Sequence, residues 1–229
     1  MTEPTRDGPA ARSPDAAPRF IAVEGPIGVG KTSLARRLAE TLGCEALLED
    51  VAGNPFLERF YREPGVNALP TQLFFLFQRI HQIRELRQGD MFQPLRVADF
   101  LLDKDPLFAR VTLDHEEFRL YQQVYDQLTF DKPIPDLVVY LQAPSETLLA
   151  RINKRGVAAE RAITLDYLER LNEAYTRFFH YYDEAPLLIV NTRDIDLIDN
   201  DLDYQRLVEY LLGIKSGRHY YSPQYNPPC

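Results

Sequence analysis

The sequence has few of the features that mark secreted, membrane or metal-binding proteins. Only two of its 229 residues are cysteines, Cys44 and Cys229, which indicates neither a disulfide framework nor a cysteine zinc site. No apolar run approaches the roughly 20 residues that span a bilayer, and the first residues lack the basic-then-apolar layout of a secretory signal. The four histidines are scattered without ligand spacing. These absences predict a protein of the reducing cytoplasm with no membrane partner.

Positive charge is also scarce. Lysine and arginine number 26 against 34 aspartate and glutamate residues, which gives a formal net charge of −8. Binding to a nucleic-acid backbone requires basic residues that release counterions, so nucleic acid is not the expected partner. The length and the 45% hydrophobic content are sufficient for one domain with a buried core.

Proline marks the two ends of the chain. Residues 1–18 contain four prolines and no apolar periodicity, which predicts a disordered leader. Residues 215–229 contain three prolines, and we expect them to form a flexible tail. The folded domain is therefore predicted over residues 19–214.

The most specific motif is Gly25–Thr32, GPIGVGKT, which satisfies the phosphate-loop pattern G-x-x-x-x-G-K-T. An apolar strand pattern precedes it and a helical pattern follows it. In such a loop, glycines let backbone N–H groups surround an anion, the lysine reaches the outer phosphates and the threonine hydroxyl binds Mg²⁺. The residues expected to hold the nucleotide are Gly25, Gly28, Gly30, Lys31, Thr32 and Ser33.

Strand patterns alternate with helix patterns along the rest of the chain. This alternation predicts an α/β fold of the P-loop NTPase type, with a parallel five-stranded sheet flanked by helices. The expected strands are Phe20–Val23, Glu45–Glu49, Leu95–Asp99, Asp136–Leu141 and Leu187–Val190. Because parallel strands end at one edge of a sheet, the phosphate loop, Glu49 and Asp99 are predicted to lie close together.

Five helices carry clear signals. Pro70 is predicted to open a long helix to about Arg87, and Thr164 to cap a helix that reaches Tyr182. Helices are also predicted over Ser145–Arg155 and Asp201–Leu212, and another from about Thr112 to Leu128.

Several further features follow the phosphate loop in a fixed order. They are the strand-end Glu49, the segment Asn54–Leu57 with Phe60 and Tyr61, Ala68–Gln72 followed by Arg79, and Arg151 and Arg155 followed by Glu160. Together they resemble the deoxynucleoside kinases, and more narrowly the bacterial deoxyadenosine and deoxyguanosine kinase branch. The resemblance covers about Arg19–Leu212. It implies transfer of the γ-phosphoryl group of ATP to the 5′-hydroxyl of a deoxynucleoside in nucleotide salvage, with Mg²⁺, a helical lid and a homodimer.

The resemblance also implies a role for each matched residue. Glu49 is the catalytic base that accepts the proton of the 5′-hydroxyl. Tyr61 and Glu160 hold the 3′-hydroxyl, since tyrosine both donates and accepts and an ionised glutamate accepts. Lys31 and the lid residues Arg151 and Arg155 supply positive charge to the transferred phosphoryl group.

Two residues of the long helix are matched to reading of the nucleobase. The Gln72 amide can form paired hydrogen bonds with a base edge, and Phe56, Phe74 or Phe108 could stack on the ring. Arg79 matches an arginine of relatives that accept cytosine or purines. The resemblance therefore implies that a purine or cytidine deoxynucleoside is preferred over thymidine.

The chain departs from the family at the end of the third strand. Where most animal relatives have an acid-Arg-Ser triplet, this sequence has Ala98-Asp99-Phe100. We expect Asp99 to take the acidic role and to hold Mg²⁺ through water. The triplet's arginine has no counterpart, and Lys104 falls where a base-reading aspartate is expected.

Two other functions share parts of these motifs. A nucleoside monophosphate kinase also uses a phosphate loop and a lid, but its anionic acceptor requires arginines rather than a carboxylate base. A GTP-binding switch protein would use Asp50–Gly53 as a D-x-x-G motif and Asn191–Asp194 as a near match to N-K-x-D. The lysine of that last motif is absent, and the lid arginines would have no role.

Overall fold

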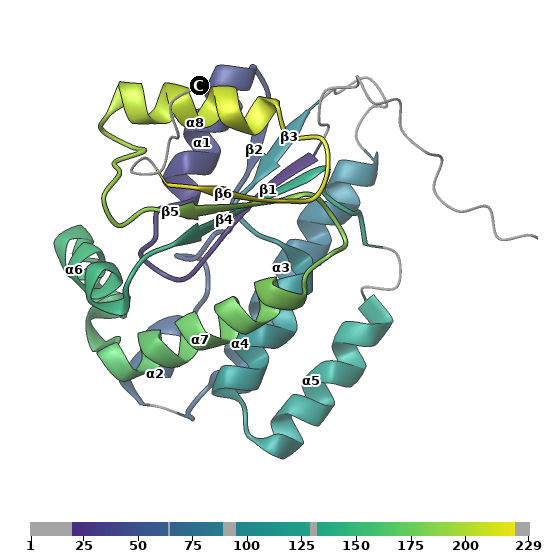
Figure 1. The fold of residues 1–229 in the computed structure, drawn as a ribbon. Helices are drawn as coiled ribbons and strands as arrows, with labels where there is room; N and C mark the ends of the chain where they lie inside the picture. Colours follow the sequence, from purple (N-terminus) through teal and green to yellow (C-terminus); the bar gives the residue numbers. More distant parts are fainter. Residues whose placement is uncertain (1–19, 64, 89–94, 129–131, 223–229) are drawn as a thin grey trace, which may run out of the picture.

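A parallel six-stranded sheet forms the centre of the molecule (Figure 1). The computed structural model describes residues 20–63, 65–88, 95–128 and 132–222, so the predicted leader over residues 1–18 lies outside the described residues. The strand order is β2-β3-β1-β4-β5-β6, and every neighbouring pair is parallel. The strands are β1 (Phe20–Glu24), β2 (Glu45–Leu47), β3 (Arg96–Ala98), β4 (Leu137–Gln142), β5 (Leu187–Asn191) and β6 (Arg218–Tyr221).

Helices cover both faces of this sheet (Figure 1). Helices α1 and α8 lie on one face, and α3, α4, α5 and α7 lie on the other. The α-helices are α1 (Lys31–Leu42), α2 (Leu57–Arg62), α3 (Ala68–Gln88), α4 (Asp105–Thr112), α5 (His115–Leu128), α6 (Ser145–Arg155), α7 (Leu165–Tyr181) and α8 (Asp201–Leu212). Two 3₁₀ turns, η1 (Leu102–Lys104) and η2 (Ala158–Ala162), precede α4 and α7. No helix among the described residues is long and apolar enough to cross a membrane.

The central strand β4 is apolar on both faces because it is covered twice. Leu137, Val139 and Leu141 pack in the cluster that contains α1 and α8, whereas Val138 and Tyr140 pack in the cluster that contains α7. This two-residue alternation between two buried faces is typical of a central parallel strand. The expected α/β fold is confirmed, and the phosphate loop emerges from β1 beside this strand.

The number of strands differs from the prediction of five. The sixth strand, β6, lies within the segment expected to be a flexible tail, so that expectation is wrong for Arg218–Tyr221. The Arg218 guanidinium donates to the carbonyl oxygens of His180 and Tyr182 at 3.0 and 3.1 Å, which joins the strand to the end of α7. The strand has only four residues, and every second one is exposed, so its sequence gives a weak strand signal. It is recognised as a strand by its pairing with β5. Residues 223–229 lie outside the described residues.

Most predicted elements are found with shifted ends. The bounds predicted for α6 and α8 match the structure, and the Thr164 hydroxyl caps α7 by accepting from the Tyr167 N–H. Helix α5 does not begin at Thr112, which instead ends α4. Asp114 accepts from the Glu117 N–H at 2.9 Å and starts the new helix there.

Candidate active site

The phosphate loop joins β1 to α1 and has positive φ at three glycines. The angle is 150° at Gly25, 83° at Gly28 and 105° at Gly30, where glycine is favoured over residues with a Cβ. Helix α1 begins directly after the loop, at Lys31, and Ser33 is exposed in its first turn. The partly positive N-terminus of a twelve-residue helix therefore lies at the loop, as an anion site requires.

Two of these glycines are also required by close packing. A Cβ at Gly25 would lie 2.5 Å from the carbonyl oxygen of Leu141, and one at Gly28 would lie 2.9 Å from the carbonyl oxygen of Leu148. Strand β4 and helix α6 therefore pack against the backbone of the loop itself. The loop is held from both sides before any ligand binds.

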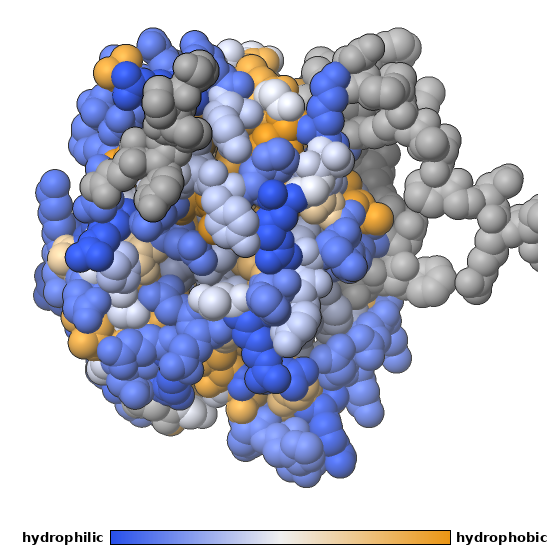
Figure 2. All heavy atoms as spheres, viewed as in Figure 1, coloured by the Kyte–Doolittle hydropathy of each residue, from blue (hydrophilic) through white to orange (hydrophobic). Residues whose placement is uncertain are grey.

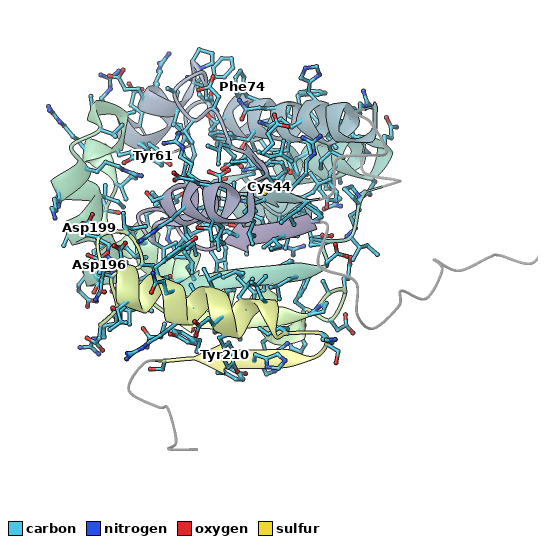
Figure 3. The ribbon with its side chains drawn as sticks, turned by 90° about the horizontal axis from the view of Figure 1, so that it is seen from above. Cys44, Tyr61, Phe74, Asp196, Asp199 and Tyr210 are labelled. Atoms are coloured by element: carbon cyan, nitrogen blue, oxygen red, sulfur yellow. The ribbon has the colours of Figure 1, made fainter. Side chains whose placement is uncertain are left out.

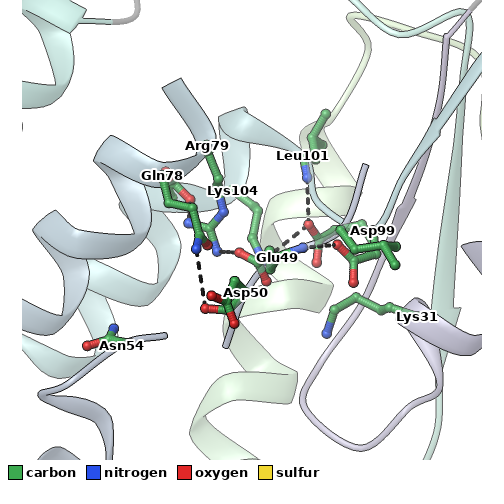
Figure 4. Close-up of polar contacts among 12 residues, drawn as sticks. Lys31, Glu49, Asp50, Asn54, Gln78, Arg79, Asp99, Leu101 and Lys104 are labelled. Atoms are coloured by element: carbon green, nitrogen blue, oxygen red, sulfur yellow. Dashed lines mark hydrogen bonds and ion pairs between the residues drawn. The ribbon is translucent and has the colours of Figure 1, made fainter. Parts of the chain in front are cut away.

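Lys31 folds back over the loop that precedes it. Its Nζ donates to the carbonyl oxygens of Gly25 at 2.7 Å and Pro26 at 3.2 Å. Burial lowers the pKa of Lys31; Glu24 opposes this shift and Lys104 adds to it. The ammonium group thus lies among the loop carbonyls, on the same side as Glu49 and Asp99 (Figure 4).

Asp99 connects the phosphate loop to the end of β2. One carboxylate oxygen accepts from the Thr32 hydroxyl at 2.5 Å. The other accepts from the Glu49 N–H at 2.9 Å (Figure 4). Burial raises the pKa of Asp99, and the nearby Glu49 charge raises it further. The prediction that the loop, Glu49 and Asp99 meet at one sheet edge is therefore confirmed by geometry.

Glu49 follows β2 by two residues and lies in a cationic environment. Its carboxylate forms an ion pair with the Arg79 guanidinium. Burial alone would raise the pKa of Glu49, but the positive charges of Arg79, Lys104 and Lys31 outweigh it and lower the pKa. Glu49 is therefore ionised at neutral pH, the state in which a carboxylate can accept a proton. Its neighbour Asp50 accepts from the Gly53 N–H at 2.9 Å and closes a turn.

Arg79 has a second partner that the sequence did not reveal. Its guanidinium also forms an ion pair with Asp105, the first residue of α4, whose side chain is 1% exposed. Burial raises the pKa of Asp105 to about 7, although Arg79 and Lys104 oppose the shift. Arg79 thus bridges two carboxylates, Glu49 and Asp105. The only sequence signal for Asp105 is its position beside Pro106 at a helix start.

These groups surround a cavity that we call the Glu49 cavity. It runs from the phosphate loop at Gly28 to helices α2, α3 and α4. The predicted residues that line it are Lys31, Thr32, Glu49, Tyr61, Gln72, Arg79, Arg155 and Glu160. Thr71, Phe75, Lys104 and Tyr167 also line it and were not predicted. With Gly28, the structure thus brings nine predicted site residues together around one space.

The predicted sugar-binding pair, Tyr61 and Glu160, lines the Glu49 cavity. Tyr61 packs edge-on against Tyr167, with ring centroids 6.1 Å apart. Burial raises the pKa of Tyr61 well above its usual value, so its hydroxyl stays protonated and can donate. Glu160 accepts from one Arg155 nitrogen through both oxygens, at 2.6 and 2.7 Å.

The predicted base-reading helix forms another wall of this cavity. The Gln72 amide nitrogen donates to the Thr112 hydroxyl at 3.2 Å, a bond that does not involve its carbonyl oxygen. The adjacent Thr71 hydroxyl is buried and has no hydrogen-bond partner among the described residues. Of the three rings predicted to stack, Phe108 lines the cavity, whereas Phe74 lies at the periphery of the molecule (Figure 3).

The two lid arginines do not face the same space. Arg151 donates to the hydroxyl and the carbonyl oxygen of Thr192, at 3.0 and 2.7 Å. It lines a second cavity, the Thr192 cavity, which is bounded by Gly28 and Gly30 of the phosphate loop and by residues 192–198. Arg155 lines the Glu49 cavity instead, so the two arginines face different cavities that share Gly28 of the loop, and their closure over one phosphoryl group stays a prediction. Asp196 and Asp199 lie in the segment before α8 (Figure 3).

No cluster of three or more histidine, cysteine, aspartate or glutamate side chains suited to a metal occurs among residues 20–63, 65–88, 95–128 and 132–222. The oxygen atoms of Thr32 and Asp99 nevertheless lie side by side at the loop. A divalent ion that is held mainly by nucleotide phosphates and water needs few protein ligands, so this pair fits Mg²⁺.

Comparison with known proteins gives consistent results. The family model for deoxynucleoside kinases matches residues 21–212. A deoxyguanosine kinase of Bacillus subtilis is 37% identical over 201 residues, which cover 84% of this chain and 95% of the relative. A deoxyadenosine kinase of Lactobacillus acidophilus is 31% identical over 196 residues, which cover 80% of this chain and 89% of the relative.

A solved structure shares the same fold. Deoxyadenosine kinase from M. mycoides, with the products dCMP and a flexible dCDP bound, aligns with a TM-score of 0.74 at 26% sequence identity. The alignment covers 85% of this chain and all of that chain. Because the family model spans most of the sequence and the fold and phosphate loop agree with it, the chain belongs to the deoxynucleoside kinase family.

Proposed function

We propose that the Glu49 cavity binds a purine deoxynucleoside, with its 5′-hydroxyl at Glu49 and its base between Gln72 and Arg79. The chain is a kinase that phosphorylates a deoxynucleoside at the expense of a nucleoside triphosphate. The observation that carries the assignment is the ionised Glu49 in the same cavity as the phosphate-loop lysine, Lys31. In the reaction, the 5′-oxygen forms a bond to the γ-phosphorus, the bond from phosphorus to the β-phosphate oxygen breaks, and Glu49 takes the hydroxyl proton.

The preference for a purine rests on the donors that face the cavity. The Arg79 guanidinium is a planar donor held by Asp105, and guanine presents two acceptors, O6 and N7, on one edge. The Gln72 amide and the unpartnered Thr71 hydroxyl add groups that can donate or accept. Phe75 and Phe108 supply rings on which a base can stack. The relatives named as deoxyguanosine and deoxyadenosine kinases support this assignment.

The sugar is proposed to lie between Tyr61 and Glu160. The protonated Tyr61 hydroxyl can donate to the 3′-oxygen, and the Glu160 carboxylate can accept from the 3′-hydroxyl. The Tyr61 ring packs against Tyr167 and is proposed to exclude a 2′-hydroxyl sterically. Arg155, already paired with Glu160, is placed to contact the transferred phosphoryl group when the cavity closes.

ATP is the proposed phosphoryl donor, with its phosphates at the loop and its base toward the Thr192 cavity beside Arg151. Thr32 and Asp99 are the proposed protein ligands of Mg²⁺, with Asp99 acting through water. The ion would supply positive charge to the β- and γ-phosphate oxygens. Lys31 and the N-terminus of α1 orient the phosphates from the protein side.

Two competing functions are less consistent with the contacts. Both cavity arginines, Arg79 and Arg155, are paired with carboxylates, whereas the anionic acceptor of a nucleoside monophosphate kinase requires arginines that are free to bind it. In a GTP-binding switch, Asp50 would approach the γ-phosphate, but here it closes its own turn.

We also propose a homodimer formed through α4 and α7. A groove between these helices is lined by Leu107, Val111, Phe178 and Tyr181, and Tyr181 is 75% exposed. Figure 2 shows a largely hydrophilic surface with scattered apolar patches. We therefore expect a dimer interface that contains both polar and apolar side chains. We place the enzyme in the cytoplasm, which fits the unpaired thiol of Cys44.

The proposed substrate is tested by a coupled ATPase assay with the four deoxynucleosides and their ribonucleoside counterparts. We expect the highest kcat/KM with deoxyguanosine or deoxyadenosine, lower values with deoxycytidine and the lowest with thymidine. Stimulation by thymidine alone, or by deoxynucleoside monophosphates but not deoxynucleosides, would contradict the assignment. Sedimentation of wild type and Tyr181→Asp tests the dimer, which the added charge is expected to dissociate.

A further inference from the structure

Lys104 is a buried cation that the proposed roles leave unused. It ends the turn η1 before α4, and only 1% of the residue is exposed. Lysine is almost never buried to this extent unless it is paired, because an ammonium loses its hydration. Its Nζ lies 3.3 Å from a carboxylate oxygen of Glu24 and 4.8 Å from the centroid of the Phe108 ring. The fold therefore holds this charge at a defined place.

Glu24 is itself fixed by three donors. One of its oxygens accepts from the Gly25 N–H and from the Tyr175 hydroxyl, each at 2.8 Å, and the other accepts from the Leu101 N–H at 2.9 Å. These bonds tie it to the phosphate loop, to α7 and to the segment after β3. Glu24 therefore holds Lys104 in position and is too enclosed, at 0% exposure, to contact a substrate.

The ammonium of Lys104 faces the reacting groups. It lines the Glu49 cavity together with Lys31, and both lysines help to lower the pKa of Glu49 (Figure 4). Four cationic side chains of the described residues line this cavity, of which Arg79 and Arg155 are paired with carboxylates that also line it. Lys104 differs because its carboxylate partner, Glu24, lies outside the lining. Its positive charge is thus directed to the space between Glu49 and the phosphate loop.

That space is where negative charge accumulates during transfer. The phosphoryl group leaves the triphosphate at Lys31 and arrives at the 5′-oxygen beside Glu49, which is itself anionic. The carboxylate of Asp99, which accepts from the Glu49 N–H, brings a second acidic group to the same edge of the sheet. An additional fixed cation on the acceptor side would reduce the repulsion between these carboxylates and the arriving phosphoryl oxygens.

We propose that Lys104 is a catalytic residue on the acceptor side: its ammonium group contacts oxygens of the transferred phosphoryl group and holds the deoxynucleoside 5′-monophosphate that forms. This inference rests on the proposed placement of the 5′-hydroxyl at Glu49. It assigns Glu24 as the positioning residue of Lys104. It also predicts that the deoxynucleoside substrate, which has no phosphoryl group, does not depend on Lys104 for binding.

The test compares Lys104→Met with wild type by calorimetric titration of deoxyguanosine and of its 5′-monophosphate, together with turnover. Loss of one such charge is expected to weaken monophosphate binding by roughly 10-fold or more and to lower kcat by about 100-fold. Binding of deoxyguanosine is expected to change less than about threefold. The matched control is Lys154→Met, which removes an exposed lysine of α6 that does not line the cavity and should behave as wild type.

Removal of Lys104 leaves Glu24 buried without its cation, so Glu24→Gln/Lys104→Met serves as the second variant if the single one fails to fold. Under the proposal the double variant regains stability but not turnover or monophosphate binding. If the double variant regains turnover and monophosphate binding, Lys104 is only a structural partner of Glu24. The same conclusion follows if Lys104→Met binds the monophosphate as wild type does. Failure of wild type to act on any deoxynucleoside would instead overturn the proposed substrate.

Discussion

Replacement of Asp105 by asparagine tests how Arg79 is held in the Glu49 cavity. The substituted side chain would keep a similar shape but lose the negative charge that pairs with the guanidinium. Arg79 would then have one charged partner, Glu49, and would move toward it. We expect weaker binding of the base, whereas Glu49 remains ionised.

The magnitude follows from the burial of the pair. Hydrogen bonds to charged groups contribute about 1.5–3 kcal/mol, and the asparagine carbonyl can retain part of one. Burial raises the pKa of Asp105, so folding disfavours its charge, and the neutral asparagine is not expected to lower the free energy of unfolding. If about 1.4 kcal/mol is lost from the orientation of Arg79 toward the base, KM for the deoxynucleoside rises about tenfold.

The protonation of Asp105 makes the same effect depend on pH. Burial raises the pKa of Asp105 to about 7, so lowering the pH through 7 adds a proton and removes the charge that holds Arg79. In wild type, KM should therefore rise as the pH falls from 8 to 6. The pKa of Glu49 is lowered, so Glu49 stays ionised over this range and kcat should change much less. In Asp105→Asn, KM should be high and independent of pH.

The measurement is steady-state kinetics with deoxyguanosine at pH 6, 7 and 8, together with urea unfolding. Asp103→Asn is the matched control, because Asp103 undergoes the same chemical change two residues away but pairs with Lys132. It should keep the wild-type KM and pH profile. If Asp105→Asn retained the wild-type KM at pH 8, Asp105 would not position Arg79 and the reasoning would be refuted.

Three further predictions concern the base, the metal and the loop. Glu49→Gln should lower kcat by roughly 10²–10⁴-fold with little change in deoxynucleoside binding, as measured by turnover and calorimetry, whereas Asp50→Asn should not. Asp99→Asn should raise the Mg²⁺ concentration that gives half-maximal activity, because one carboxylate oxygen near Thr32 is replaced; an unchanged Mg²⁺ titration would exclude that role. Gly25→Ala should lower the free energy of unfolding by at least about 2 kcal/mol, as measured by thermal unfolding, because its Cβ would meet the Leu141 carbonyl oxygen. Gly43→Ala is the control: its Cβ meets no atom within 4 Å, and the loss should be only about 1 kcal/mol. Equal losses would show that close packing at Gly25 does not limit stability.

The sequence predicted the parts of this site that depend on local spacing. The phosphate loop and Glu49 follow apolar strand patterns, so their place at the sheet edge could be inferred from parallel topology alone. Asp105 and Lys104 could not be placed in this way. Whether they face the cavity or the solvent depends on the turn η1, whose direction is set by Glu24 and the segment after β3.

The same limit applies to the lid. Helical spacing predicts that Arg151 and Arg155 lie near one face of α6. The phosphate loop packs against that helix at Gly28, so residues one turn apart reach different cavities. The partner of Arg151, Thr192, follows β5 and has no local signal near α6.

Strand β6 also determines which part of the sheet is open to other molecules. Without it, β5 would be the edge strand and would present the backbone of Leu187–Val190, whose residues are buried in the present fold. An apolar, uncharged edge of this kind is a template for pairing with other chains. β6 replaces it with a short edge that carries Arg218 and His219. A truncation after Gly217 is therefore expected to leave the catalytic groups in place but to make the protein prone to aggregation.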